Sequence, residues 1–404
     1  MKQISLFVFL TFFSINNSYS QEQDTAFSSI KNGISKPSIL STHPFGIFFS
    51  RIQGNFKSIP TRKHSLNISL ESGNVWGTPI KTYIPNDESI RNEARKYEWH
   101  QAQYFFDEES LDAKSFELQI DGVIKGLRLN TNFRLGNQHE LNLGLRFFML
   151  TKGKAPFTIL TSDKFVENFH NKIAGGDDPF DRGVFGHNKA QIKYLDRNGS
   201  RIELTNNDFF IGGLETTYYY YPKALSTDTF YTNFGAHFGT NLSKYNSSID
   251  FGLSSNITKK ILMPNENFVQ IGLGLGALRK GVLNMKQNNV DFGTNNFIGH
   301  LESALEYNFI SKKRTIHSFG VDFYFQTSLN KKDELEYIIP IRNPDAHKAW
   351  GHGVTNLYKN NNYWTFLYSF TKKVTTTFYL QQDFTVNNNP DIQTGVSIAF
   401  NLIK

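Results

Sequence analysis

Charged side chains at alternate positions of apolar segments are the residues of this chain best placed to do chemistry. Successive side chains of a β-strand point to opposite faces, so each charge would lie opposite its apolar neighbours. The candidates are Arg128, Arg134, Arg146, Glu215, His237, Asp250, His300, Glu302, Glu306, Asp322 and Asp383. In a closed sheet they could pair across the interior as a hydrogen-bonded network. They could instead line a water-filled path and select the ions or polar solutes that pass; the sequence leaves both open.

Histidine and serine are the residues to test for hydrolysis of lipids. A His-x-Ser pair on one strand would place both side chains on the same face, but no histidine among the eleven is followed by serine two residues later. His64-Ser65 and His317-Ser318 are adjacent, so their side chains would face opposite ways and could not form a nucleophile–base pair. The chain has no cysteine, which excludes thiolate chemistry and disulfides. We therefore predict no enzyme, and a triad drawn from distant strands stays open as an alternative.

Two groups of loop residues have metal-ligand chemistry. The first group is Asp177, Asp178 and Asp181. These carboxylates are ligands that calcium prefers, but they lack the spacing of a calcium loop and are better explained as solvated loop residues. The second group is His347 and His352, which are spaced five apart. A candidate loop motif consists of Phe180, Asp181 and Arg182. We predict no metal and no cofactor.

The elements that must position these side chains are β-strands. In residues 127–150, Leu127 and Leu129 alternate with Arg128, and the alternation resumes after a short turn at 136–137. The same pattern recurs from about residue 64 onward and predicts an all-β fold, a transmembrane antiparallel up-and-down β-barrel of about twelve strands (range about 10 to 14). The predicted strands are about 64–74, 112–135, 139–150, 208–221, 229–240, 246–257, 265–279, 296–310, 315–328, 362–372, 374–384 and 391–403.

The second predicted strand, 112–135, is too long for one regular strand. Its apolar phase also changes between Ile120 and Leu127. A β-bulge inserts one extra residue and reverses the phase of the residues that follow it. We therefore predict a bulge near Gly122 or Gly126.

The connections between these strands alternate in length. The long ones are 75–111, 151–207, 280–295 and 329–361, and all four fall at the same end of the predicted barrel. Outer-membrane barrels have long extracellular loops and short periplasmic turns. Twelve strands enclose a lumen too wide to be filled by Phe, Leu and Tyr side chains, so we predict that the apolar faces meet lipid and the polar faces line the interior. Aromatic residues that fit interfacial girdles, or ordinary strand ends, are Tyr218, Tyr220, Tyr307 and Trp364.

The chain divides into three predicted segments. Residues 1–20 have the basic start, apolar run and small residues of a cleaved signal peptide, and about 12 apolar residues are too few for the alternative, a membrane anchor. Residues 21–63 form a periplasmic or plug-like segment that could enter the barrel, lie beneath it or be a disordered leader. Residues 64–404 form the barrel, with an extracellular insertion at 151–207 in which 162–176 predicts a short amphipathic helix.

The formal net charge is +7, with a sequence pI of about 9.2. The basic residues are scattered and the chain is predicted to be exported, so we predict no nucleic-acid partner. Aromatic residues make up 15% of the chain although the mean hydropathy is −0.41, which is typical of apolar residues spread in alternation rather than in blocks. The predicted location is the outer membrane of a Gram-negative bacterium. The predicted partners are outer-membrane lipid, a small polar solute and the barrel-assembly machinery during biogenesis.

Several runs of the chain resemble a known family. They are HPFGIF through SLNISLESGNVW, LRLNTNFRLGNQHELNLGLRF, FVENFHNKIAGGDDPFDRGVFGHNKAQIKY and the hairpin that ends in RIEL. These runs are similar to the bacterial envelope proteins of domain-of-unknown-function family 3187, over most of residues 40–225. The resemblance implies an outer-membrane-type barrel and nothing catalytic, and the glycine-aromatic style resembles that of Bacteroidota. The last strand departs from many barrels because Phe400 is followed by four further residues instead of ending the chain.

These observations give two hypotheses for the function, with a third below them. The first is a narrow channel or uptake route for a small solute. The second is a closed barrel that acts as a surface-interaction or structural protein through its long loops. An outer-membrane enzyme with a dispersed site is the third.

Overall fold

The computed structural model describes residues 31–36, 51–61, 64–77, 81–83, 115–117, 120–153, 158, 160–174, 187, 189–195, 198, 200–286, 289–329, 331, 360–383 and 391–401. Several predictions lie outside these residues: the signal peptide, the Phe180-Asp181-Arg182 motif, Asp177 and Asp178, and the pair His347 and His352. No helix among the described residues is long and apolar enough to cross a bilayer. The segment from Asn32 onward belongs to the same structural unit as the strands.

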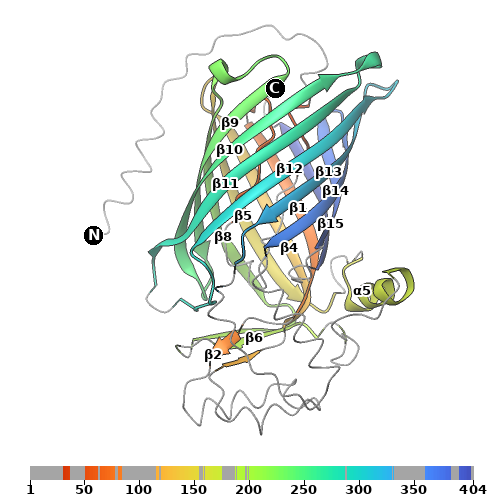
Figure 1. Ribbon diagram of the computed structural model, residues 1–404. Coiled ribbons are helices and arrows are strands. Elements are labelled where there is room, and N and C mark those ends of the chain that lie inside the picture. Colours follow the sequence, from red (N-terminus) through yellow and green to blue (C-terminus); the bar gives the residue numbers. More distant parts are fainter. Residues whose placement is uncertain are drawn as a thin grey trace. The chain divides into compact units, whose positions relative to one another are not determined.

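Twelve antiparallel strands form a closed barrel (Figure 1). Neighbours in sequence pair with one another, and β1 pairs with both β4 and β16, which closes the sheet. The strands are β1 (His64–Gly77), β4 (Ile120–Arg134), β5 (His139–Thr151), β8 (Phe209–Tyr220), β9 (Phe230–Leu242), β10 (Ser247–Leu262), β11 (Phe268–Asn284), β12 (Phe297–Ile310), β13 (Ile316–Gln326), β14 (Asn361–Thr371), β15 (Val374–Asp383) and β16 (Ile392–Asn401). Closure leaves no unpaired edge, as a β-sheet in a membrane requires. The predicted barrel of twelve strands is confirmed.

The barrel has two unlike ends. At the turn end, where β1 begins, the strands are joined by short turns such as 135–138 and 372–373. At the loop end, where β1 finishes, they are joined by the long connections 78–119 and 152–208, among others. Two small elements belong to these loops: β2 (Lys81–Tyr83) pairs with β3 (Ser115–Glu117), and β6 (Gln191–Leu195) pairs with β7 (Arg201–Leu204) and with β4. Two short 3-10 turns, Lys223–Leu225 and Pro264–Glu266, lie at the turn end.

One short helix, α5 (Asp163–Phe169), lies in the connection between β5 and β8, and a π-helical turn, His170–Ala174, follows it. The Ser162 side chain caps the start of α5 by accepting a hydrogen bond from the Phe165 backbone N–H. A serine at this position satisfies one of the N–H groups that the first turn of a helix leaves unpaired. The helix expected over 162–176 is therefore present.

The second predicted strand needs a correction. Residues 112–135 do not form one bulged strand: 115–117 belong to the separate pair β2–β3, and the barrel strand begins at Ile120. Along its described register, β4 pairs with β1 past both Gly122 and Gly126 without a shift. The apolar phase changes for another reason: Val123 and Ile124 are adjacent, point to opposite faces and are both buried. Both faces of the barrel wall are thus covered at this end, so the residues there need not alternate.

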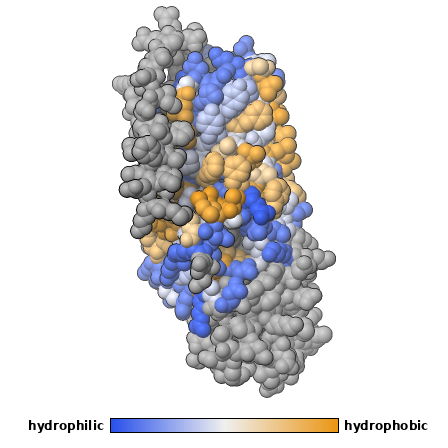
Figure 2. All heavy atoms as spheres, turned by 90° about the vertical axis from the view of Figure 1, so that its left-hand side faces the viewer, coloured by the Kyte–Doolittle hydropathy of each residue, from blue (hydrophilic) through white to orange (hydrophobic). Residues whose placement is uncertain are grey.

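The outer face of the barrel carries large apolar side chains that are exposed on the isolated chain. Figure 2 shows hydrophobic residues gathered across the strands on one side of the molecule. We call this set the apolar belt: Leu70, Leu145, Phe234, Phe238, Leu253, Leu273, Leu275, Leu305, Phe319, Phe366, Phe378 and Ile398. Exposure of such a band to water is unfavourable, whereas lipid acyl chains solvate it. The predicted orientation, apolar outward and polar inward, is confirmed.

Aromatic residues lie on the outer face near both ends of the barrel. Tyr218, Tyr220 and Tyr307 are near the turn end, and Trp364 is near the loop end; each is 38–41% exposed. The Tyr218 hydroxyl lies 2.6 Å from Nδ1 of His139, next to the 135–138 turn. Amphipathic rings at these heights are typical of the girdles of membrane barrels.

Candidate functional site in the barrel lumen

The inward face of the barrel is polar and closely packed. Glu302 and Asp322 are 0% exposed although they are charged, and both lie on the face opposite the apolar belt. Buried charges need partners, because an unpaired ion loses its hydration without compensation. The partners come from two sources, which differ from one side of the lumen to the other.

Part of the lumen is occupied by the chain's own N-terminal segment. We call residues 32–36 and 51–61 the lumen segment. Its two parts run side by side: the Ile34 N–H donates to the Phe56 carbonyl at 3.2 Å, and the Asn32 side chain bonds backbone groups of Ser58 and Ile59. The segment therefore forms two arms that meet the inward side chains of several strands.

Near the turn end, the lumen segment is held by one buried carboxylate. Nζ of Lys57 lies 2.6 Å from Oε1 of Glu140, and the Thr61 backbone N–H donates to Oε2 of the same group at 2.6 Å. Lys57 also donates to the side chains of Asn132 and Thr61. Each oxygen of the Glu140 carboxylate accepts a hydrogen bond from the lumen segment, so Glu140 fixes this end of the segment.

Beside this anchor, the next contacts of the lumen segment are neutral hydrogen bonds. The Asn55 backbone N–H donates to Asn256, the Asn55 carbonyl accepts from Asn233, and the Asn55 amide donates to the Tyr221 hydroxyl at 2.9 Å. The Asn256 amide in turn donates to Asn233 at 2.9 Å. Burial raises the pKa of Tyr221 well above its usual value, so the hydroxyl stays protonated. Asn55 is thus held on three sides by β9, β10 and the turn that follows β8.

Farther toward the loop end, inward acids bind the lumen segment again. Lys36 pairs with Glu302 and lies 3.8 Å from Asp322, while Glu302 also accepts from the Gly54 backbone N–H. The Ser35 N–H donates to Glu306 at 3.2 Å. The Arg51 guanidinium lies 3.7 Å over the ring of Tyr324, close enough for a cation–π contact.

The lumen segment also needs empty space, and glycines supply it. We call Gly252, Gly272 and Gly274, on β10 and β11, the glycine wall. A Cβ at Gly272 would lie 2.6 Å from the Phe56 ring, and one at Gly252 would meet the Ile52 side chain. Phe56 packs with Ile34 and Ala304, and Ile52 packs with an inward apolar group. That group is Leu278, Ile298 and Leu329.

The opposite side of the lumen is filled by the barrel's own side chains. We call Glu71, Arg128, Tyr379 and Gln393, on β1, β4, β15 and β16, the self-filled wall. Nε of Arg128 lies 3.0 Å from Oε1 of Glu71, while the Tyr379 hydroxyl and the Gln393 amide donate to Oε2 at 3.0 and 2.7 Å. Both oxygens of the buried carboxylate are satisfied, so this cluster is a complete charge-assisted network.

A second ion pair links β5 to β8. Nε of Arg146 lies 3.0 Å from Glu215, and Arg146 also donates to Asn241, whose amide donates to Asp250 at 2.9 Å. In a buried network of this kind, any polar group left without a hydrogen-bond partner would destabilise the fold. These contacts join three predicted residues, Arg146, Glu215 and Asp250, through Asn241, which was not predicted.

The remaining predicted residues lie at separate places. Arg134 is at the turn end and donates to the Gly136 carbonyl and to Asn137, while Asp383 is at the loop end of β15. His300 stacks on Tyr324 with ring centroids 5.7 Å apart. Sequence reasoning did not select Glu71, Glu140 or the cations of the lumen segment. Glu71 and Glu140 could have been selected, because each occupies a polar position in the alternation of its own strand. Nothing in the sequence pattern of the lumen segment marks its cations as inward-facing.

One histidine pairs with a serine from a neighbouring strand. Nε2 of His237 lies 2.8 Å from Oγ of Ser254, and Nδ1 lies 3.1 Å from Oγ1 of Thr217. A hydrolytic triad needs an acid on the second ring nitrogen to orient and stabilise the imidazolium. Here a threonine occupies that position, so the arrangement is a neutral hydrogen-bonded chain. Within the described part of the molecule, no cluster of three His, Asp or Glu side chains could hold a metal ion.

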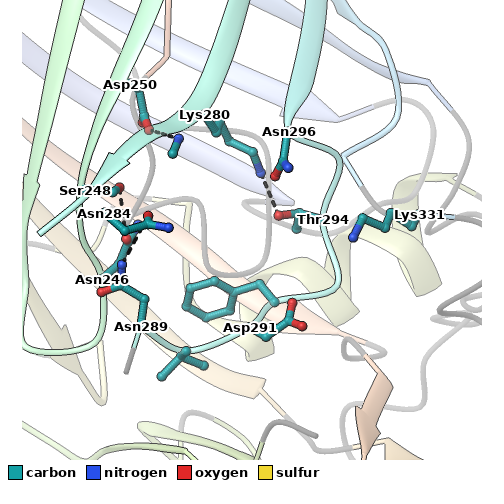
Figure 3. Close-up of a pocket in the computed structure, with 13 residues that line it drawn as sticks. Asn246, Ser248, Asp250, Lys280, Asn284, Asn289, Asp291, Thr294, Asn296 and Lys331 are labelled. Carbon is teal, nitrogen blue, oxygen red and sulfur yellow. Dashed lines mark hydrogen bonds between the residues drawn. The ribbon is translucent and has the colours of Figure 1, made fainter. Parts of the chain in front are cut away.

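A polar pocket of about 220 Å³ opens at the loop end, between the β9–β10 and β11–β12 connections (Figure 3). Nζ of Lys280 donates to Thr294 at 2.6 Å, and Asp250 accepts from the Gly281 N–H at 2.9 Å. The other polar residues around it are Asn246, Ser248, Asn284, Asn289, Asp291, Asn296 and Lys331. The pocket therefore offers amides and both signs of charge to a small polar molecule.

Together, the closed sheet, the apolar belt and the buried polar lumen define a β-barrel of the outer-membrane type. No family model matches the chain, so the resemblance to family 3187 is not confirmed. No curated protein matches it in sequence.

Solved structures similar to the chain are outer-membrane proteins. An outer-membrane channel from Pseudomonas putida F1 is 11% identical with a TM-score of 0.38, and the match covers 87% of this chain and 99% of the channel. The NanC porin is 9% identical with a TM-score of 0.36, covering 69% of this chain and 94% of the porin. LpxR from Salmonella typhimurium is 9% identical with a TM-score of 0.35, covering 83% and 99%. Likeness at this level concerns only the barrel architecture.

Proposed function

We propose that the chain is an outer-membrane β-barrel whose lumen is a narrow route for a small polar solute, closed at rest by the lumen segment. The observation that carries this is the way the segment is bound. Its contacts are hydrogen bonds and ion pairs to inward side chains, such as Lys57 to Glu140 and Lys36 to Glu302, with only small apolar clusters. Water can replace polar contacts of this kind, so the segment can leave without exposing a large apolar surface.

The loop-end pocket supports a polar solute. Lys280 and Asp250 lie on inward positions of β11 and β10, just inside the end of the barrel that carries the long loops. A pocket lined by amides, a lysine and carboxylates favours a molecule with several hydroxyl or charged groups over an apolar one. The solute would meet this pocket first and the lumen segment second.

Removal of residues 32–61 tests the proposal. In planar bilayers the full-length protein should show little steady conductance, and the protein without residues 32–61 should show a persistent open level. A matched control is Arg314→Ala, which removes an exposed ion pair to Glu266 at the turn end and should leave conductance unchanged. Heat-dependent mobility in detergent gels reports whether each variant is folded. A folded deletion variant that conducts no more than the full-length protein would contradict the channel.

The second candidate is a closed barrel that works through its long loops. The self-filled wall favours it, because its network is buried, satisfied and independent of the lumen segment. Under this alternative the deletion variant stays non-conducting, and removing residues 163–176 abolishes capture of a surface partner while the barrel remains folded. Hydrolysis has the least support, since the Ser254–His237 pair lacks an acid.

A further inference from the structure

Helix α5 and the turn after it carry apolar side chains at every fourth position: Phe165 is half-buried, and Phe169 and Ile173 are exposed. Phe169 is 42% exposed and Ile173 is 72% exposed, and the rings of Phe165 and Phe169 stack with centroids 6.4 Å apart. A spacing of four places the three residues on one face of the helix. Leu160, just before the helix, is 38% exposed as well. An apolar stripe of this kind is unfavourable in water. The position of the helix on the barrel indicates what the stripe contacts instead.

The opposite side of this segment is fixed to the outer wall of the barrel. The Asn74 amide donates to Oδ1 of Asp163 at 2.6 Å, and the Ser72 hydroxyl lies 2.7 Å from that of Thr161. Ser72 and Asn74 alternate in phase with Leu70 of the apolar belt, so they face outward. Asp163 and Thr161 are completely buried in these contacts. The helix therefore lies beside the barrel rather than over its mouth, as Figure 1 also shows.

The height of the helix follows from the same strand. Ser72 is two residues beyond Leu70, and Asn74 is four beyond it, which corresponds to about 7 and about 13 Å along the strand. On the neighbouring strand β4, Lys125 lies two residues from the outward Leu127 and pairs in register with Ser72. Nζ of Lys125 donates to the Ser72 hydroxyl at 2.7 Å. On β1 and β4 the outward residues turn from apolar to polar at this level, from Leu70 and Leu127 to Ser72 and Lys125. A membrane would place the boundary between acyl chains and headgroups here.

The charges around the stripe are basic. Lys164 and Lys172 are exposed, and Lys172 immediately precedes Ile173. The two acids of the helix are engaged elsewhere: Asp163 is buried against Asn74, and Glu167 lies 2.5 Å from His187. An apolar stripe flanked by lysines is the pattern of a helix that lies in the interface of an anionic membrane.

We propose that residues 160–174 form an interfacial anchor on the outer leaflet. Phe165, Phe169 and Ile173 insert at the headgroup–acyl boundary, and Lys164 and Lys172 contact anionic headgroups. The partner is the lipid surface itself, which the apolar belt meets as far as Leu70 on the strand that holds the helix. This role is independent of conduction, because its contacts lie on the outside of the barrel wall.

Site-specific labelling tests the anchor on the full-length protein, which has no cysteine of its own. Ile173→Cys, carrying an environment-sensitive fluorophore, is placed in vesicles of phosphatidylcholine and phosphatidylglycerol. Its emission should be blue-shifted and quenched by lipids that carry a spin label near the headgroup. Asn171→Cys, exposed two residues earlier, is the matched control and should emit as in water; Leu253→Cys in the apolar belt should be quenched by a deep spin label.

The quenching at position 173 should be several-fold that at position 171. Equal quenching at the two positions would overturn the proposal. So would protection of position 173 without lipid quenching, if cross-linking then joined two copies through it. Lys172→Glu should weaken the blue shift at 173 in vesicles that contain phosphatidylglycerol and leave it unchanged in phosphatidylcholine alone. An equal response in both vesicle types would contradict the role given to the lysines.

Discussion

The self-filled wall and the glycine wall occupy the two sides of one lumen, and they fill it by opposite means. On the first, the acid Glu71 is satisfied by side chains of three other strands. On the second, inward glycines leave room, and on the adjacent strand β12 the acid Glu302 is bound by Lys36 and the Gly54 N–H of the lumen segment. Side chains of the wall cannot leave without unfolding, whereas a segment can. Stability of the barrel and occupancy of the lumen should therefore be separable properties.

The largest effect should come from removing the acid of the self-filled wall. Glu71→Ala removes the carboxylate that pairs with the buried Arg128 guanidinium, and breaking such a pair costs about 3–5 kcal/mol. Glu302→Ala is the matched change on β12, beside the glycine wall, and should cost only about 1 kcal/mol, because Lys36 can move into water with its segment. Urea unfolding in lipid vesicles, followed by tryptophan fluorescence, measures both. Equal losses would remove the distinction between the walls.

Tyr379→Phe should have the next largest effect. It removes one hydroxyl donor to the Glu71 carboxylate and leaves the Arg128 and Gln393 contacts in place. A hydrogen bond to a charged group is worth about 1.5–3 kcal/mol. Tyr324→Phe is the comparison on the other side of the lumen: it loses the bond to Gln326 beside Arg51 of the lumen segment, and it should lose less because Arg51 can leave with that segment. The same unfolding experiment compares them, and a larger loss for Tyr324→Phe would reverse the expected order.

Gly272→Ala should act only through the lumen segment. Its Cβ would lie 2.6 Å from the Phe56 ring, and overpacking of this kind costs about 1–3 kcal/mol. The expected result is faster hydrogen exchange in residues 51–61 and higher conductance, with the strands unchanged. In the variant without residues 32–61 the substitution should be neutral. A loss of barrel stability in that background would show that Gly272 is needed by the wall itself.

The smallest effect should be the coupling between Lys57 and Glu140. Nζ of Lys57 lies 2.6 Å from the carboxylate, but the lysine side chain is 27% exposed and is partly screened by water. A double-mutant cycle with Lys57→Met and Glu140→Gln should give a coupling of about 0.5–1 kcal/mol. Protease sensitivity of the lumen segment is the readout. No coupling would mean that the Thr61 N–H alone anchors this end.

Much of the barrel could be predicted from the sequence because alternation is a local signal. The residues of Phe319–Phe325 or Leu301–Leu305 already say which side chains share a face, and pairing of neighbours in an up-and-down sheet follows from short turns. Arg146 and Glu215 could thus be placed on the same inward face before their 3.0 Å contact was known. The start of β4 could not be predicted, because it has apolar residues on both faces and therefore lacks the alternation that marks a strand.

The lumen segment could not be located from its sequence. Residues 51–61 have no strand or helix pattern, and the strand residues that they bind, such as Asn132 and Glu302, lie 75 and 248 residues away. Lys57 and Glu140 carry opposite charges, but so do many residue pairs that never meet. The role of the glycine wall could not be predicted either, because an inward glycine leaves space but does not indicate which residues occupy it. Placement of α5 against Asn74 depended on a contact across 89 residues.

The two arms of the lumen segment begin at the same end of the barrel, where Asn32 bonds Ser58 and Ile59 close to the Glu140 anchor. The strand ladder is closed by β1 against β16 over the pairs from Ser65–Asn401 to Gly73–Gln393. The described arms, 32–36 and 51–61, both reach this end, so release of their contacts there would break no inter-strand bond of that seam.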